Sequence, residues 1–234
     1  MENTKNNIEK MRRAAAHIDD VLTIVPENIL KIGATEKDVC NQFDEFLTAN
    51  GNLERAFPTI IAFGENTAEP HHTPSDRELA PNEHVLIDCG VKIDGWCSDC
   101  TRNFFVGDPD PEFLEKFEKL LEIFETTLPL FLPGTPVKVL DKFVREKLGA
   151  DAKFFVHTLG HGVGREVHEP PKISVKSDEI LEENSVVTCE PGIYFPGKFG
   201  IRIEDQLVVR KDEPEILTRS PRTLQVFEAS GEWF

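Results

Sequence analysis

The chain has 234 residues, 39% of them hydrophobic and 29% charged, proportions typical of a globular protein with one large or two small domains. Its formal net charge of −16 argues against nucleic acid and anionic membranes as partners. No apolar run approaches the roughly 20 residues of a membrane span. The N-terminal residues are polar, unlike a signal peptide, and the odd count of five cysteines favours a reducing compartment, so we expect a cytoplasmic protein.

The first quarter of the chain predicts two amphipathic helices. Apolar residues recur at helical spacing over residues 6–25, and Pro26 interrupts the pattern. Thr35, three residues before Asp38, predicts an N-cap with a capping box for a second helix that reaches about residue 49 and stops at Asn50-Gly51. The residues expected to face the core are Ile8, Met11, Ala15, Ile18, Val21, Leu22, Val39, Phe43, Phe46 and Leu47. A buried strand over 59–63 and a turn-rich loop over 64–76, which carries His71 and His72, come next.

Residues 85–106 predict a β-hairpin that brings two carboxylates together. Asp94-Gly95 is typical of a type I′ turn, in which both central residues need positive φ. A turn centred there pairs Asp88 with Thr101 and puts Asp88 and Asp99 on one face as diagonal cross-strand neighbours. Two carboxylates this close repel, so we expect a cation between them.

The second half repeats the order helix, helix, strands. Asp110 and Pro111 predict the start of a long Phe-rich helix, which Pro129 ends or bends. A helix over 136–148 and strands over 154–156, 186–189 and 201–209 follow. Gly33-Ala34-Thr35 and Gly134-Thr135-Pro136 each precede a helix. This echo, with no low-complexity linker, predicts two similar α+β halves in one domain spanning residues 1–234.

Further acids and histidines gather in the second half. Three histidines lie within twelve residues (His157, His161 and His168), and His161 is flanked by glycines. Glu190 ends an apolar strand, and Glu204 lies in another, where an ion pair with Arg202 is the structural alternative to a ligand role. Four carboxylates and one imidazole suit two divalent cations, with manganese or cobalt expected and zinc or iron as alternatives. The set is Asp88, Asp99, His161, Glu190 and Glu204.

The Cys97–Cys100 spacing suggests a zinc or redox site, but on a strand the two side chains point to opposite faces, which favours packing.

These five residues, in this order and spacing, resemble the pita-bread metallopeptidases, which are the methionine aminopeptidases, Xaa-Pro aminopeptidases and prolidases. The resemblance implies a curved antiparallel sheet with outer helices. It also implies that Asp88 chelates one metal, that His161 and Glu190 chelate the other, and that Asp99 and Glu204 bridge both. His71 matches the family histidine that shuttles a proton, and His168 matches the one that contacts the substrate carbonyl. Glu190 is expected to relay a proton as well.

Three motifs resemble the proline-specific branch of this family: Ser98–Arg102, His157–His161 and Gly200–Asp205. The resemblance adds His157 and Arg202 as substrate-binding residues, and implies an exopeptidase that cuts a peptide between its N-terminal residue and a following proline. A methionine aminopeptidase and a non-catalytic pita-bread binding protein are the alternatives, while complete ligands disfavour a metal-free amidinohydrolase. Proline-specific members usually carry an N-terminal domain that this chain is expected to lack. The preference for dipeptides or for longer peptides is therefore left open. The oligomeric state is also left open, with a homodimer as one possibility.

Overall fold

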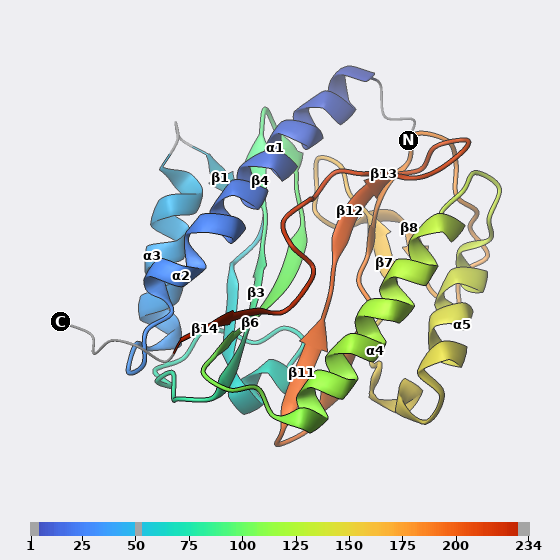
Figure 1. Ribbon diagram of the computed structural model, residues 1–234. Helices are drawn as coiled ribbons and strands as arrows, with labels where there is room; N and C mark the ends of the chain where they lie inside the picture. Colours follow the sequence, from blue (N-terminus) through green and yellow to red (C-terminus); the bar gives the residue numbers. More distant parts are fainter. Residues whose placement is uncertain (1–4, 50–52, 229–234) are drawn as a thin grey trace.

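Two α+β halves lie side by side in the computed structural model, which describes residues 5–49 and 53–228 (Figure 1). The first half contains α1 (Lys5–Ile24), α2 (Pro26–Ile29), α3 (Glu36–Thr48), β1 (Glu54–Arg55), β2 (Ile60–Phe63), η1 (Gly64–Ala68), β3 (Glu83–Cys89), β4 (Val91–Ile93), β5 (Trp96–Cys97) and β6 (Cys100–Val106). The second half contains α4 (Pro111–Thr127), η2 (Leu128–Leu130), α5 (Val137–Leu148), η3 (Gly149–Phe154), β7 (Gly160–Gly162), β8 (Glu169–Ile173), β9 (Val186–Cys189), β10 (Gly192–Phe195), β11 (Phe199–Arg202), β12 (Asp205–Val208) and β13 (Glu215–Ile216). The last strand, β14 (Gln225–Phe227), returns to the first half.

The strands form a mostly antiparallel surface with the helices outside it (Figure 1). One sheet has the order β14-β6-β3-β2 and another the order β13-β12-β9-β7-β8, with smaller sheets β1-β4-β5 and β10-β11. The parallel pairing of β14 with β6 departs from the expected antiparallel pattern. This mixed α+β architecture confirms the predicted fold class.

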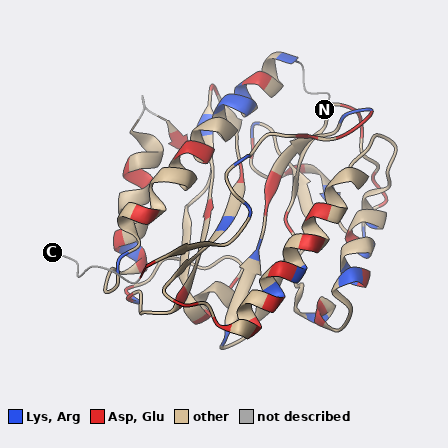
Figure 2. Ribbon diagram, in the orientation of Figure 1, with Lys and Arg blue, Asp and Glu red and all other residues tan. Residues whose placement is uncertain are grey.

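The helices pack mainly on the strands of their own half, and the N-terminal part of α1 also packs on β9 and β12 of the second half. One apolar cluster joins α1 and α3 to β2, β3 and β6, and a second joins α4 and α5 to the strands of the second half. Both N-caps form as predicted: Thr35 and Asp38 make a reciprocal capping box, and Asp110 accepts hydrogen bonds at the start of α4. Figure 2 shows many Asp and Glu positions, in red, along the outer helices. No helix in the described part of the chain is both long and apolar enough to span a membrane.

The two halves are related in backbone detail. Before α3, the Gly33 amide donates to the Leu79 carbonyl and the Leu79 amide returns a bond to Ala34, both at 2.9 Å. Before α5, the Gly134 amide donates to Leu181 at 2.8 Å and the Leu181 amide returns a bond to Thr135 at 2.9 Å. The weak sequence echo therefore marks a real structural repeat.

Several local predictions are wrong, and one concerns residues that the structure does not describe. Phe46, expected in the core, is 49% exposed on the outer face of α3. Residues 154–156 do not form a strand: a 3-10 helix runs to Phe154 and irregular backbone follows. The strand expected over 201–209 is broken at residues 203–204, because β11 pairs with β10 whereas β12 pairs with β9. The helix stop at Asn50-Gly51 lies outside the described residues.

Candidate metal centre

The hairpin forms with the predicted register. Ile93 pairs with Trp96, and Asp94 and Gly95 have φ of 51° and 79°. Asp88 pairs with Thr101, as expected. The second strand is interrupted at residues 98–99, between β5 and β6, and Asp99 lies in this break.

Opposite the interruption, Gly90 permits a close approach of the two strands. A Cβ on Gly90 would lie 2.1 Å from the Ser98 carbonyl oxygen, so only glycine lets the two strands approach here. The Ser98 side chain accepts a hydrogen bond from the Val91 amide at 3.0 Å, and the Ser98 amide donates to the Val91 carbonyl at 2.9 Å. Ser98 thus holds the local backbone from which Asp99 projects.

The second half supplies the other three predicted ligands, one within a strand, one directly after a strand and one between two strands. His161 is in β7, Glu190 directly follows β9, and Glu204 lies between β11 and β12. Ligand atoms of Asp99, His161 and Glu204 all lie within 4.8 Å of one another. His161 Nε2 is 3.2 Å from Glu190 and 3.6 Å from Asp99. Residues more than 60 positions apart in the chain therefore meet in one cluster at the junction of the two halves.

His161 is oriented for ligation through Nε2. Its Nδ1 lies 3.1 Å from the Gly162 carbonyl, which can only accept, so Nδ1 carries the proton. The other ring nitrogen, Nε2, faces Glu190, whose hydrogen bond and charge raise the pKa of His161 against the effect of burial; a bound cation would take the place of the Nε2 proton. An imidazole fixed by a hydrogen bond from its remote nitrogen is the arrangement usual for metal-binding histidines.

The carboxylates of the cluster repel one another. Burial, reinforced by the charges of Glu204 and Asp88, raises the pKa of Asp99 well above its usual value. Burial and the charges of Glu190 and Asp88 do the same to the pKa of Glu204. Burial also raises the pKa of Asp88, although Arg202 opposes the shift. Glu190 behaves differently: burial opposes its ionisation, but the hydrogen bond and charge of His161 lower its pKa.

The residues present fit divalent cations. The donors are oxygen-rich with a single imidazole, a set suited to hard or borderline metals. Asp88 Oδ1 is buried and has no hydrogen-bond partner in the described part of the chain, so this carboxylate oxygen lacks a donor. Cations would both satisfy this atom and offset the repulsion among the carboxylates.

Arg202 forms its ion pair with Asp88. The sequence had suggested Glu204 as its partner. The distance from Arg202 Nη2 to Asp88 Oδ2 is 2.6 Å, and Nε donates to Thr101 Oγ1 at 3.0 Å. Glu204 instead accepts a hydrogen bond from Thr101 at 2.6 Å. Arg202 is only 3% exposed, so its guanidinium is committed to contacts inside the protein.

Tyr194 is a site residue that sequence reasoning missed. Its hydroxyl lies 2.7 Å from His157 Nε2 and accepts a hydrogen bond from Arg202 Nη1 at 2.8 Å. It therefore links the predicted substrate-binding residues His157 and Arg202. Tyr194 is the only tyrosine of the chain, and this count is the one signal in the sequence that could have drawn attention to it.

The remaining histidines divide into those near the cluster and those apart from it. The rings of His161 and His168 are in edge contact, with centroids 4.3 Å apart. His157 Nδ1 is 3.8 Å from Glu190. His71 is exposed, and its charge acts on the pKa values of Asp88, His157 and His168. His72, by contrast, is buried against Glu36, so of the two adjacent histidines only His71 is placed toward the cluster.

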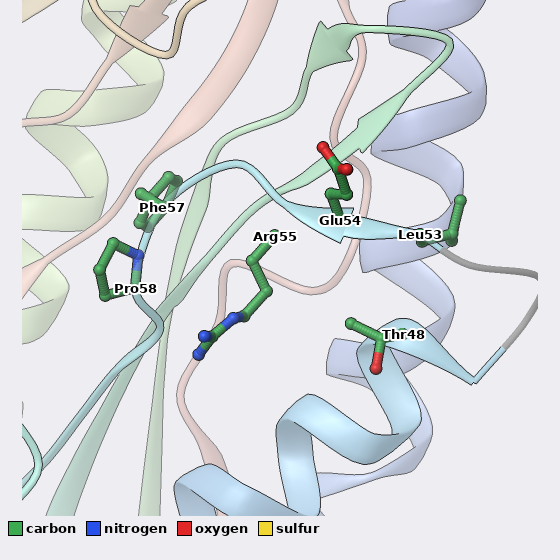
Figure 3. A pocket seen from close by; sticks show the side chains of 6 residues that line it. All are labelled: Thr48, Leu53, Glu54, Arg55, Phe57 and Pro58. Carbon is green, nitrogen blue, oxygen red and sulfur yellow. The ribbon is translucent and has the colours of Figure 1, made fainter.

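Two other features lie outside the cluster. Cys97 and Cys100 are free thiols whose sulfur atoms donate to different carbonyls, those of Arg165 and Glu204. Figure 3 shows a surface hollow beside β1 and α3, and none of its lining residues is a predicted site residue. These residues are Thr48, Leu53, Glu54, Arg55, Phe57 and Pro58. The Arg55 guanidinium in this hollow is already paired with Asp44.

The fold and the cluster together define a metal-binding protein of the mixed α+β class. Residues 9–211 match the model of metallopeptidase family M24, and the chain belongs to this family. An uncharacterized peptidase from Staphylococcus aureus (strain bovine RF122 / ET3-1) is 38% identical over 217 residues, which cover 92% of this chain and 62% of the relative. The chain thus spans less than two thirds of the length of this curated relative.

Solved structures with the same fold include three whose names refer to proline-directed peptidases. An X-Pro aminopeptidase from Thermotoga maritima is 37% identical with a TM-score of 0.92, covering 97% of this chain and 64% of that one. A prolidase from Pyrococcus furiosus is 36% identical with a TM-score of 0.90 and coverages of 94% and 66%. An Xaa-Pro dipeptidase from Bacillus anthracis is 32% identical with a TM-score of 0.90 and coverages of 96% and 64%. These matches confirm the pita-bread fold.

Proposed function

We propose that residues 1–234 form the catalytic domain of a dinuclear exopeptidase that hydrolyses the bond between an N-terminal residue and a following proline. The observation that carries the proposal is the convergence of Asp99, His161 and Glu204 within 4.8 Å, beside Glu190 and the unsatisfied Asp88 oxygen. The names of the solved relatives support the preference for proline. Because the cluster draws ligands from both halves, the two halves act as one domain.

The proposed ligand arrangement uses all five predicted residues. Asp88 would hold one ion, His161 and Glu190 would hold the other, and Asp99 and Glu204 would be shared between them. Manganese or cobalt is the proposed metal, with zinc or iron as alternatives. When bound, such ions polarise the scissile carbonyl and lower the pKa of water at the site.

Four side chains handle protons and orient the substrate in this proposal. Glu190 accepts a proton near the reacting carbonyl. His168, exposed beside the His161 ring, donates a hydrogen bond to the carbonyl oxygen as negative charge develops there. His71 delivers a proton to the departing proline nitrogen. His157 contacts the substrate from the side of Glu190.

Arg202 enters the proposal in a modified role. The resemblance implies that it binds substrate, but its guanidinium is buried and bonded to Asp88, Thr101 and Tyr194. We propose that it acts on the substrate indirectly, by fixing the Asp88 carboxylate and the Tyr194 hydroxyl. The three nitrogens of the planar guanidinium each donate to a different one of these partners, which the single ammonium group of a lysine would not match.

A peptide panel tests the proposal. Purified protein loaded with manganese or cobalt is expected to release the first residue of Xaa-Pro dipeptides or tripeptides. Turnover of Met-Ala peptides without Xaa-Pro cleavage would identify a methionine aminopeptidase instead. Calorimetric titration gives a second readout, since failure to bind two ions would indicate a non-catalytic member of the fold. Asp99→Ala should abolish both signals, whereas the matched exposed variant Asp178→Ala should retain them.

A further inference from the structure

The loop that presents His71 is organised around a buried carboxylate, Glu36. Glu36 is the first residue of α3, and its side chain is completely buried. It accepts five hydrogen bonds, all from residues 63–75. The donors are the Phe63 amide (2.8 Å), Asn66 Nδ2 (2.9 Å), His72 Nε2 (2.8 Å), the Ser75 amide (2.9 Å) and Ser75 Oγ (2.6 Å). A buried carboxylate is tolerated only when it is satisfied in this way, so Glu36 and the loop form one unit.

His72 joins the middle of the loop to this carboxylate. Its Nε2 faces Glu36, while its Nδ1 lies 3.1 Å from Glu69 Oε2. Its backbone amide donates to the Glu69 carbonyl, also at 3.1 Å. The side chain is 8% exposed. An imidazole with an acceptor at each ring nitrogen has one favoured orientation, so His72 fixes the backbone of its own residue.

His71 therefore lies between two anchored neighbours. On one side, the Pro70 carbonyl accepts a hydrogen bond from Arg202 Nη1 at 3.2 Å, and Arg202 is in turn paired with Asp88. On the other side is His72 with its bond to Glu36. The His71 side chain is exposed, and its charge acts on Asp88 in the cluster. The backbone at residue 71 is thus held on both sides, which limits the directions that the His71 side chain can take.

We propose that His72, bound to Glu36, is a positioning residue that holds His71 at the distance from the metal centre that proton delivery requires. This inference rests on the proposed function, in which His71 protonates the departing nitrogen. His72 touches neither substrate nor metal in this arrangement. Its contribution passes entirely through the orientation of its neighbour.

A double-mutant cycle measures this coupling. In metal-loaded protein acting on an Xaa-Pro peptide, His71→Ala should lower kcat about 100-fold, the effect of losing a general acid. His72→Ala should lower kcat about 10-fold with KM nearly unchanged, because a misplaced proton donor slows the chemical step. The double variant should be no slower than His71→Ala alone, since His72 has nothing to position once His71 is absent.

Two further variants separate positioning from general destabilisation. His72→Gln keeps a nitrogen donor for Glu36 and should recover part of the lost kcat. His17→Ala is the matched control. The partly buried His17 also makes a hydrogen bond through its ring, with Nε2 2.7 Å from the Leu47 carbonyl oxygen, but this bond joins α1 to α3 and lies outside the loop. This variant should leave kcat unchanged. Multiplicative losses in the double variant, or an equal loss in His17→Ala, would overturn the proposal.

A measurement independent of turnover keeps the two proposals distinguishable. In zinc-loaded, isotope-labelled protein, the ring signal of His71, assigned by its disappearance in His71→Ala, should move toward the position of free histidine in His72→Ala. It should stay in place in His17→Ala. If wild-type protein cleaves no Xaa-Pro peptide, the proposed function fails while this signal still decides the positioning role. A His71 signal unmoved by His72→Ala refutes positioning whatever the assay shows.

Discussion

Replacing Asp99 by asparagine is expected to stabilise the metal-free protein and to destabilise the metal-loaded protein relative to wild type. Asp99 is 4% exposed and lies among other carboxylates, with an oxygen within 4.8 Å of one from Glu204. Asparagine keeps the shape of the side chain, removes its charge and can donate a hydrogen bond to a neighbouring carboxylate. The change should therefore relieve repulsion when no cation is bound.

The distance sets the size of the effect. Two unit charges 4.8 Å apart repel by about 3.5 kcal/mol at an effective dielectric constant of about 20. Wild-type protein avoids part of this by protonating a carboxylate, so we expect a gain of about 1–3 kcal/mol at pH 7 in chelator. Because burial and nearby charges raise the pKa of Asp99 in the folded state, the folded protein binds more protons than the unfolded chain. The wild-type penalty is absent below the unfolded pKa of about 4 and grows as the pH rises, so the gain is larger at pH 8 than at pH 5.

Urea denaturation of both proteins, in chelator and in manganese, tests this reasoning. With metal at about 1,000 times its dissociation constant, wild-type protein gains about 4.1 kcal/mol that the variant does not, which exceeds the variant's advantage in chelator, so the order of stability reverses. Asp178→Asn, an exposed control, should show no reversal. Equal destabilisation by Asp99→Asn with and without metal would show that Asp99 is a packing residue and that the repulsion argument is wrong.

Two other substitutions probe the support of the site and the fold. Arg102 is 1% exposed, and its guanidinium bonds Asp205 and the carbonyls of Glu204 and Ser220. Arg102→Met leaves these groups without their partner, so the free energy of unfolding, measured in urea, should fall by about 3–5 kcal/mol. A loss under about 1 kcal/mol would contradict this. Thr35→Ala removes the cap of α3 and should cost about 1 kcal/mol by thermal or urea unfolding. Thr135 lies one position before Pro136, the N-cap residue of α5, which makes no side-chain capping hydrogen bond, so Thr135→Ala should cost less, and equal losses would exclude the cap as the cause.

Features controlled by neighbouring residues could be predicted from the sequence. The hairpin register follows from the positive φ that Asp94-Gly95 accepts, and this local fact is enough to place Asp88 opposite Thr101. The Thr35 capping box is equally local. The failure at Phe46 shows the limit: helical spacing gives a face to the residue, but the width of the buried stripe depends on what packs against the helix.

Features controlled by distant partners could not be predicted. Alternation along one strand placed Arg202 beside Glu204, but the chain changes sheet partners at residues 203–204 and Arg202 turns to Asp88, 114 positions earlier. Tyr194 follows the same rule, since its hydrogen bond to His157 joins residues from separate elements. The identity of the five candidate ligands came from motif resemblance, and the structure adds which of their atoms meet.

The parallel pairing of β14 with β6 has a consequence for how the protein is made. Residues 225–227 complete the sheet of the first half by pairing with residues 104–106, and the Phe227 ring stacks on Phe104 with centroids 6.0 Å apart. During synthesis the outer edge of β6 is therefore open until more than a hundred further residues have left the ribosome. Such an edge is a template for pairing with other chains, and long-range closure is slow. The exposed edge of the first half is thus covered only when β14 has been synthesised and has paired with β6.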